Sequence, residues 1–402
     1  MNRVKLIPRS IGLLLLTTAS VAWSADLTYD IPGGDLELDW NRPGRSVRFV
    51  SDDGNFDIRP GVRLHVDALV TDDDITNLND DIEIRKLRLH LRARLFQDWR
   101  FKIDGEFSPD RDVDWRNLWV SYRGFERVDI RVGNRISPAG LDAATSSDNL
   151  TFMERSLADA LTPGFQLGGS VRTWSPFGSA TVGVFSAPVF EKNDRNHSKG
   201  VSVASRLTFA PWIGEDHVLH LGMSGVYRAL GGASHYRIRS RPEVGSLGRL
   251  INTGRIKGID DAFTFGIEAA IVNGPFSAQG EYLRTELFRP GSNLMFNGGY
   301  FQGSVFLTGE SRPYSVSYGS FRWIQPKRTL GALEFALRWS RLDLDDSEIR
   351  GGNENNYTVG VNWYLNQNVR LMFNAVFADI DLRKNGVNDN PNLYQFRLQV
   401  VF

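Results

Sequence analysis

Arginine is the residue type in this sequence whose spacing most clearly suggests chemistry. Of 47 basic residues, 39 are arginine and eight are lysine. In residues 87–95, Arg88, Arg92 and Arg94 occupy even positions, with His90 between them and no acid. A guanidinium keeps its proton and presents several fixed N–H donors, so a row of them suits brief contacts with oxyanions. The pattern predicts a surface that attracts anions.

The same alternating placement extends to arginines along the rest of the chain. The residues predicted to line an anion path are Arg63, Arg88, Arg92, Arg94, Arg131, Arg135, Arg155, Arg338 and Arg370. The alternative interpretation is pairing with acids on the same predicted face, which are Asp67, Asp104, Glu106, Asp129, Glu268, Glu281 and Glu334. We expect most of the arginines to be structural in this way, with residues 87–95 as the exception.

Patterns typical of catalysis or metal binding are missing from the sequence. It has no cysteine and no GxSxG, HExxH or GxGxxG motif, which removes the common hydrolase, zinc and dinucleotide signatures. Among the six histidines, His217 and His220 lie beside a short turn and are expected to be solvated. The acidic run at residues 72–74 does not complete a calcium loop. We predict no enzyme, no cofactor and no metal, with a hydrolase whose site is dispersed as the alternative.

The start of the chain predicts export. Arg3, Lys5 and Arg9 precede an apolar stretch at residues 11–21, and small residues flank Trp23 before residue 25. This is the pattern of a cleaved signal peptide over residues 1–24; a membrane anchor would need about 20 uninterrupted apolar residues. Residues 25–56 are then expected to form an N-terminal periplasmic segment. The 47 basic and 47 acidic residues cancel, so bulk charge favours no nucleic-acid partner.

The elements that must position the arginines are strands, because hydrophobicity alternates with a period of two. In residues 394–402 every even position is apolar, and residues 357–365 and 369–377 repeat the pattern. Alternation by itself also fits a soluble β-sandwich. Short turns, however, alternate with longer polar loops at residues 71–81, 187–200, 286–298, 343–355 and 379–392, and aromatic residues gather near the short turns. This is the pattern of transmembrane barrels. Residues predicted to face lipid are Val359, Val361, Trp363, Leu371, Phe373, Phe396, Leu398 and Val400.

Parity sets the strand count. Seventeen candidate strands appear, and bacterial single-chain barrels have an even number. Residues 236–241 break the up-and-down order, so residues 230–260 are predicted to be one outer loop. Residues 309–330 then become a long periplasmic connection. The sequence therefore predicts an all-β, 16-stranded antiparallel transmembrane β-barrel over residues 57–402, wide enough for an aqueous channel.

The insertion at residues 134–165 is too long for a plain connection and is predicted to fold inward as a constriction loop. Its TSSD motif at residues 145–148 and a predicted helix at residues 152–161 resemble the constriction loop of the phosphate-selective porin O/P family. The resemblance continues through IRKLRLHLRARLFQDWRFKIDGEF, YFQGSVFLTGESRPYS and NWYLNQNVRLMFN to the terminal Phe402. It covers the chain from about residue 55 onward.

That resemblance implies a homotrimeric channel in the lipid of a Gram-negative outer membrane, through which small hydrophilic solutes, anions above all, diffuse passively. One departure affects specificity. The constriction loop has no lysine. Its two cations, Arg135 and Arg155, are outnumbered by four acids, Asp142, Asp148, Glu154 and Asp159. We therefore expect a general anion preference, with phosphate or polyphosphate specificity, a non-selective porin and an outer-membrane hydrolase left as alternatives.

Overall fold

The computed structural model describes residues 2–5, 27–38, 47–108, 111–188, 200–230, 235–382 and 387–402. The predicted signal peptide lies outside these ranges except for β1 (Asn2–Lys5), which pairs with β2 (Leu27–Ile31). Within the described part of the chain, no helix is long and apolar enough to span a membrane.

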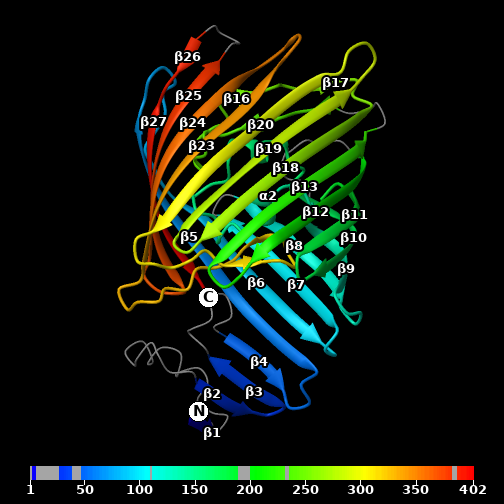
Figure 1. The fold of residues 1–402 in the computed structure, drawn as a ribbon, viewed down its shortest axis with the longest axis vertical. Coiled ribbons are helices and arrows are strands. Elements are labelled where there is room, and N and C mark those ends of the chain that lie inside the picture. The colour runs from blue at the N-terminus through cyan, green and yellow to red at the C-terminus, as the bar shows by residue number, and fades with distance from the viewer. Residues whose placement is uncertain are drawn as a thin grey trace.

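Sixteen antiparallel strands of the described chain close into a barrel, because the last one, β27, pairs with the first one, β5 (Figure 1). The prediction of a 16-stranded barrel is confirmed. The strands are β5 (Phe56–Asp72), β6 (Asp81–Leu95), β7 (Trp99–Ser108), β8 (Arg111–Tyr122), β9 (Val128–Ile136), β10 (Phe165–Ser175), β11 (Gly178–Ser186), β12 (Val201–Ile213), β13 (His217–Ala229), β18 (Asp261–Asn273), β19 (Phe276–Phe288), β20 (Leu294–Phe306), β23 (Ala332–Asp346), β24 (Ile349–Tyr364), β25 (Val369–Leu382) and β27 (Asn392–Val401).

Alternation along these strands separates a lipid-facing side from the lumen. Of the residues predicted to face lipid, Trp363, Leu371, Phe396 and Leu398 are exposed, and the other four are half-buried on the same faces. The aromatic residues near the short turns are mostly exposed as well, as a membrane-interface girdle requires. Trp174 and Tyr364 are exceptions to the predicted girdle. Trp174 lies against Arg172 in the lumen, and Tyr364 is buried there beside Glu334.

The outer ends of the strands extend further than predicted. Residues 286–298 and 343–355 were expected to be long loops, but only residues 289–293 and 347–348 separate the strands there. Polar residues can continue a ladder beyond the membrane because water solvates both faces. The central parts of two other predicted loops, residues 189–199 and 383–386, lie outside the described residues.

Residues 230–260 do not cross the membrane, as predicted. Their described part forms two small hairpin ladders, β14 (His235–Tyr236) with β17 (Ile256–Lys257) and β15 (Arg239–Ser240) with β16 (Ile251–Asn252). Ile238 and Ile251 pack with Leu157 and Leu161 of the constriction loop and with apolar side chains of β19, β20 and β23. This apolar packing fills one side of the lumen and leaves the side of β5 to β10 open.

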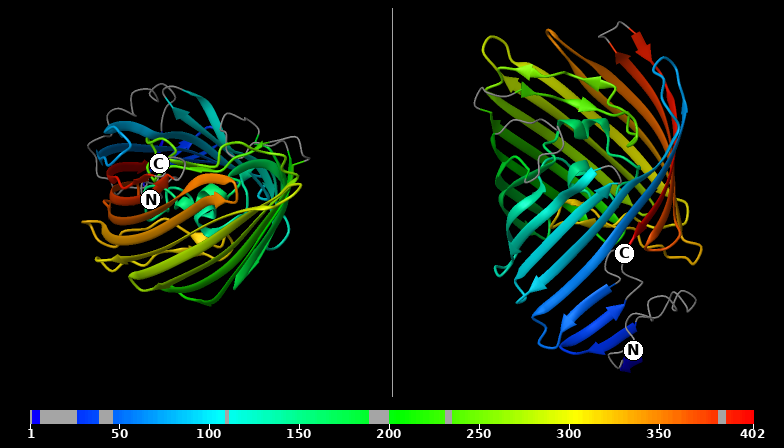
Figure 2. Two further views of the ribbon diagram at one scale, coloured as in Figure 1. Left: turned by 90° about the horizontal axis from the view of Figure 1, so that it is seen from above. Right: turned by 180° about the vertical axis from the view of Figure 1, so that it is seen from behind.

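The constriction loop was predicted at residues 134–165 and spans residues 137–164, between β9 and β10, because both strands extend into the predicted range. It lies inside the ring of strands (Figure 2). It carries α2 (Leu141–Ala144) and a 3-10 turn at Leu157–Leu161, so the predicted helix over residues 152–161 is present only in its second half. Gly140 precedes α2 with φ 77°, and a Cβ there would lie 1.9 Å from Glu281 Oε1. Only glycine lets the loop approach β19 this closely.

Residues 307–331 connect β20 to β23, and we call them the inserted turn. They were expected to be a long periplasmic connection, but they enter the lumen. β21 (Tyr314–Ser315) pairs with β22 (Ser320–Phe321), and Phe321 packs with Leu141 of the constriction loop. Asn149 Nδ2 donates to the Phe321 carbonyl at 3.3 Å. Two connections from opposite ends of the barrel therefore meet inside it.

A short N-terminal sheet precedes the barrel. β2, β3 (Gly34–Leu38) and β4 (Val47–Ser51) pair in order, and β4 pairs with the start of β5. Figure 1 shows these strands below the barrel, at the end where the chain terminates. That end is the one with the short turns, where we expected the periplasm.

Candidate functional site

A cavity of about 800 Å³ lies beside the constriction loop, mainly against β5 to β10. Fifteen arginines and two lysines line it, against four carboxylates. Fixed charge of one sign in a narrow lumen concentrates counter-ions and sets selectivity. We call the cavity-lining cations of β5 to β10 and of the turn after β8 the basic wall; they are Arg59, Arg63, Arg85, Lys86, Arg88, Arg92, Arg94, Arg100, Lys102, Arg116, Arg123, Arg131, Arg135 and Arg172.

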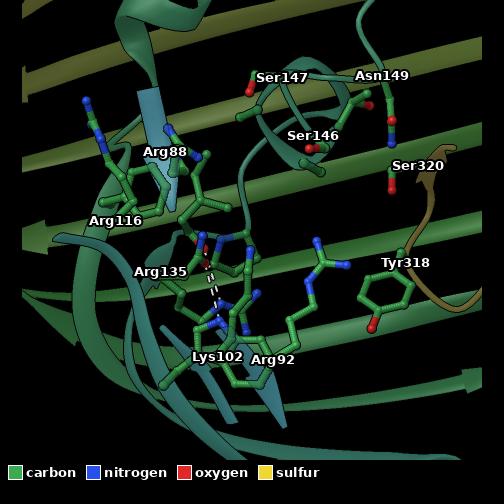
Figure 3. A pocket seen from close by; sticks show the side chains of 18 of the residues that line it. Arg88, Arg92, Lys102, Arg116, Arg135, Ser146, Ser147, Asn149, Tyr318 and Ser320 are labelled. Atoms are coloured by element: carbon green, nitrogen blue, oxygen red, sulfur yellow. Dashed lines mark hydrogen bonds between the residues drawn. The ribbon is translucent and has the colours of Figure 1, made fainter. Parts of the chain in front are cut away.

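Polar groups face the basic wall from two other segments. Figure 3 shows the cations on one side of the opening, with the constriction loop and the inserted turn on the others. The labelled residues are Arg88, Arg92, Lys102, Arg116 and Arg135 of the basic wall, Ser146, Ser147 and Asn149 of the constriction loop, and Tyr318 and Ser320 of the inserted turn. An anion in this opening would meet cationic N–H groups on one side and the neutral hydroxyl and amide groups of Ser146, Ser147, Asn149 and Ser320 on the other.

Four of the predicted arginines lie on β5 and β6 and line the cavity. Arg63 Nε lies 3.0 Å from Asp148 of the constriction loop. Arg88 pairs with Glu106 of β7, and an Arg94 guanidinium nitrogen lies 3.5 Å from Asp57. Residues 87–95 contain no acid themselves, but the expectation that their arginines have no acidic partner is wrong, since Glu106 and Asp57 approach from neighbouring strands. Arg94 nevertheless keeps 40% of its side chain exposed.

Three further predicted arginines also line the cavity. Arg131 of β9 pairs with Asp129 at 2.8 Å. Arg135, also of β9, donates to Ser170 Oγ at 2.8 Å. Arg155 holds the constriction loop together, because it donates to the carbonyls of Asp142 and Thr145 at 3.0 and 2.8 Å.

Arg338 and Arg370 face inward as predicted but are not on the cavity wall. Both are buried beneath the constriction loop. Arg370 donates to the carbonyls of Leu150 and Thr151 at 2.7 and 2.9 Å, and Arg338 donates to the Glu154 carbonyl at 3.0 Å. Their assignment to the anion path is therefore corrected, because the loop covers them and uses their donors.

Two lysines that were not predicted reach the cavity from the barrel wall. Lys86 Nζ donates to Ser147 Oγ at 2.9 Å, and Lys102 Nζ lies 2.8 Å from Asp104. Both occupy even positions on β6 and β7, in phase with Arg88 and Arg92. Alternation could have identified them. Although the constriction loop has no lysine, the opening that it narrows has two.

Most acids of the constriction loop are paired with cations, although Glu154 and Asp159 also line the cavity. Burial would raise the pKa of Glu154, but Arg85 at 3.0 Å and Arg397 at 2.9 Å hold that pKa well below its usual range. Burial likewise opposes ionisation of Asp148, whose pKa is lowered chiefly by Arg63. Asp142 accepts from the Ser156 backbone N–H at 2.8 Å. The formal negative charge of the loop is thus largely compensated by the wall.

The inserted turn is fixed by arginines of the opposite wall. Arg123 donates to the Tyr318 hydroxyl at 2.9 Å. Arg206 of β12 donates to the carbonyls of Tyr318 and Gly319 at 3.2 and 2.7 Å. Sequence reasoning missed this part of the site because the connection was placed in the periplasm. Its several aromatic residues were the available signal, since a solvated turn would not need them.

His220 is buried rather than solvated, which corrects the prediction. Its Nε2 lies 2.9 Å from Glu268, and its Nδ1 lies 2.6 Å from the Tyr314 hydroxyl of the inserted turn. Neither His220 nor Glu268 lines the cavity, so the contact anchors the turn to β13 and β18. Among the described residues, no group of three or more His, Asp or Glu side chains has the arrangement of a metal site.

Comparisons with known proteins agree with this geometry. The family model for phosphate-selective porin O and P matches residues 58–402. Porin O of Pseudomonas aeruginosa is 27% identical and covers 97% of both chains. An uncharacterised protein of Caulobacter vibrioides is 28% identical over 91% of this chain and 77% of its own length.

Solved porins share the fold. The anion-selective porin from Comamonas acidovorans aligns with a TM-score of 0.55 at 14% identity, covering 86% of this chain and all of the other. The trimer form of OmpT from Vibrio cholerae aligns with a TM-score of 0.53 at 11% identity, covering 86% and 99%. The closed barrel, the cation-lined lumen and a family match over most of the chain lead to one conclusion: this chain belongs to the phosphate-selective porin O and P family and is a channel of the Gram-negative outer membrane.

Proposed function

We propose that the chain forms a passive diffusion channel for small hydrophilic solutes and that the basic wall gives it its anion preference. The observation that carries this proposal is the charge of the cavity, where seventeen cationic side chains line the opening against four carboxylates. The whole chain has as many acidic as basic residues, so the excess of cationic side chains in the cavity arises from where the fold places them. Charges in a narrow, partly desolvated pore are screened less than charges in bulk water.

The proposed path runs between the basic wall and the constriction loop. Arg92 and Arg94 of β6 lie on it, with Arg63, Arg88 and Arg131 beside them and Arg135 and Arg155 near the loop. A cation would have to pass the same excess of cationic side chains. Conduction requires that an anion bind to this wall and leave it again.

Phosphate-type oxyanions fit the opening better than halides do. Their several acceptor oxygens can use guanidinium, ammonium and hydroxyl donors together. Arg92 and Lys102 offer such donors from the wall, and Ser146 and Ser147 offer hydroxyls from the constriction loop. We therefore include phosphate among the preferred permeants, on the basis of the two wall lysines.

Planar-bilayer recording tests the proposal. Under a KCl gradient the channel should conduct, and the sign of its reversal potential should show that chloride is more permeant than potassium. Phosphate added to the chloride solution should reduce the chloride current. An equal preference for potassium and chloride would leave a non-selective porin. The absence of conductance, together with a hydrolytic activity lost on mutation of one histidine, would favour an outer-membrane hydrolase.

We also propose that three copies assemble and that residues 1–24 are removed on export. The solved trimer form of OmpT supports a trimeric assembly for this fold. Crosslinking in mild detergent should give a ladder ending at three copies. Mass spectrometry of the membrane fraction should find a mature chain that begins at Ala25.

A further inference from the structure

Tyr318 of the inserted turn lies inside a cluster of arginines. Its hydroxyl accepts from Arg123 Nη2 at 2.9 Å, and the Arg172 guanidinium carbon lies 3.8 Å from the centre of its ring. Arg322, on the same turn, lies farther away, at 5.6 Å from the ring centre. Tyr318 and the three arginines all line the cavity. A phenol in such a place accepts hydrogen bonds from groups that could otherwise bind an anion.

The charges around Tyr318 are unbalanced. Arg123 follows β8, Arg131 belongs to β9 and Arg172 to β10, and all three share one carboxylate, Asp129, at 2.7 to 2.8 Å. Arg206 of β12 holds the backbone of the turn and is itself paired with Glu268. Three guanidinium charges against one carboxylate leave a net charge of plus two next to the phenol oxygen.

We propose that Tyr318 is a specificity-determining residue of the channel: its phenol oxygen occupies a position that a permeant anion would take among Arg123, Arg131 and Arg172, and the loss of its proton lowers the anion preference. This inference rests on the proposed function, because it assumes that anions pass the basic wall. It adds a titrating group on a segment that enters the lumen from the other end of the barrel than the constriction loop does.

The electrostatics give the direction of the effect. Burial alone would raise the pKa of Tyr318, but Arg172, Arg123 and Arg131 lower that pKa to about 6. Below this pH the neutral phenol leaves the cluster at plus two, and above it the phenolate reduces the cluster to plus one. The anion preference should therefore be highest in acid and fall as the pH rises through the Tyr318 transition.

Tyr314 provides a matched control on the same turn. Its hydroxyl also has a buried hydrogen-bond partner, His220, at 2.6 Å. Burial raises the pKa of Tyr314, so it keeps its proton over the range in which Tyr318 titrates. Tyr314→Phe removes a hydroxyl and one contact of the turn without removing a titrating charge.

The test measures the reversal potential under a KCl gradient between about pH 5 and about pH 7, for the wild type, Tyr318→Phe and Tyr314→Phe. We expect the anion-to-cation permeability ratio of the wild type and of Tyr314→Phe to fall severalfold over this range. In Tyr318→Phe the ratio should stay near its acidic value. The wild type and Tyr318→Phe share every other titrating group, so the difference between these two proteins isolates Tyr318, and Tyr314→Phe controls for the loss of a hydroxyl from the inserted turn.

Ultraviolet difference absorbance gives a second readout on the detergent-solubilised barrel. One tyrosinate should form in this pH range in the wild type and in Tyr314→Phe, and none in Tyr318→Phe. Arg123→Gln should move the transition to higher pH even if Tyr318→Phe fails to assemble. An identical pH profile in wild type and Tyr318→Phe, or no tyrosinate in the wild type, overturns the inference. A wild type without anion preference at any pH would instead overturn the proposed function.

Discussion

At the scale of single residues, arginine side chains have two different roles in this barrel. Arginines of β6 to β10 line the cavity, whereas Arg338, Arg370 and Arg397 donate to carbonyls of the constriction loop. Alternation predicted correctly that Arg88, Arg92 and Arg94 of β6, and also Arg338 and Arg370, face inward. It could not separate the two groups, because the separation depends on where a loop docks, and periodicity within a strand contains no information about that docking.

Arg370→Met tests the structural role. Two loop carbonyls, of Leu150 and Thr151, would lose their donor while remaining buried. An unsatisfied buried group costs about 1–3 kcal/mol, so the constriction loop should loosen and the barrel should lose its heat-modifiable gel mobility at a lower temperature. Arg341→Met is the control, since Arg341 is 45% exposed on β23. Equal stability of the two variants would contradict this role.

Gly61→Ala tests how tightly the first strand is packed. A Cβ at Gly61 would lie 2.3 Å from the His90 ring and 2.5 Å from the carbonyl oxygen of Phe402. Overpacking of this kind costs about 1–3 kcal/mol, and here it would strain the pairing that closes the barrel. Gly169→Ala, where the nearest atom is 3.9 Å away, should be nearly neutral. The midpoint of thermal unfolding in detergent compares them, and a neutral Gly61→Ala would refute the packing argument.

At the scale of elements, two segments enter the lumen, and the sequence predicted one of them. The constriction loop was recognisable because about thirty residues between two strands are too many for a plain connection. The inserted turn is nearly as long, but its length was assigned to the periplasm. Its contacts with the wall, such as Tyr314 with His220 and Tyr318 with Arg123, join residues far apart in the chain. Local periodicity does not report such contacts.

Gly140→Ala tests the contact that holds the constriction loop against β19. Glu281 accepts from the backbone N–H groups of Leu141 and Asp142 at 3.1 Å, and the added methyl group would collide with this carboxylate. The loop should move away from β19, and single-channel conductance and current noise should rise while the barrel still assembles. Gly248→Ala, in the outer loop with no atom within 4 Å of its Cβ, should conduct like the wild type. An unchanged Gly140→Ala channel would mean that the loop does not limit conduction.

At the scale of the whole molecule, the fold was predictable because lipid on one side and water on the other impose one period on every strand. The strand count followed from parity, and the described structure confirms it. The sequence did not predict how far the strands extend beyond the membrane, because polar residues there can continue as strand or as turn equally well. The charge of the lumen did not follow either, since the chain is neutral overall and the excess appears only when β5 to β10 are placed side by side.

The central claim is that the basic wall sets anion preference, and one measurement tests it most directly. Reversal potentials under a KCl gradient should be recorded for the wild type, for Arg88→Gln, Arg92→Gln and Arg94→Gln combined, and for a control with Arg284→Gln and Arg341→Gln, two half-exposed arginines outside the cavity. The account predicts that the reversal potential of the triple variant moves towards zero, with a smaller change in conductance, and that the control matches the wild type. An unchanged reversal potential in the triple variant would contradict it, because these side chains would then be neutralised by Glu106, Asp57 and other acids rather than acting on the permeant ion.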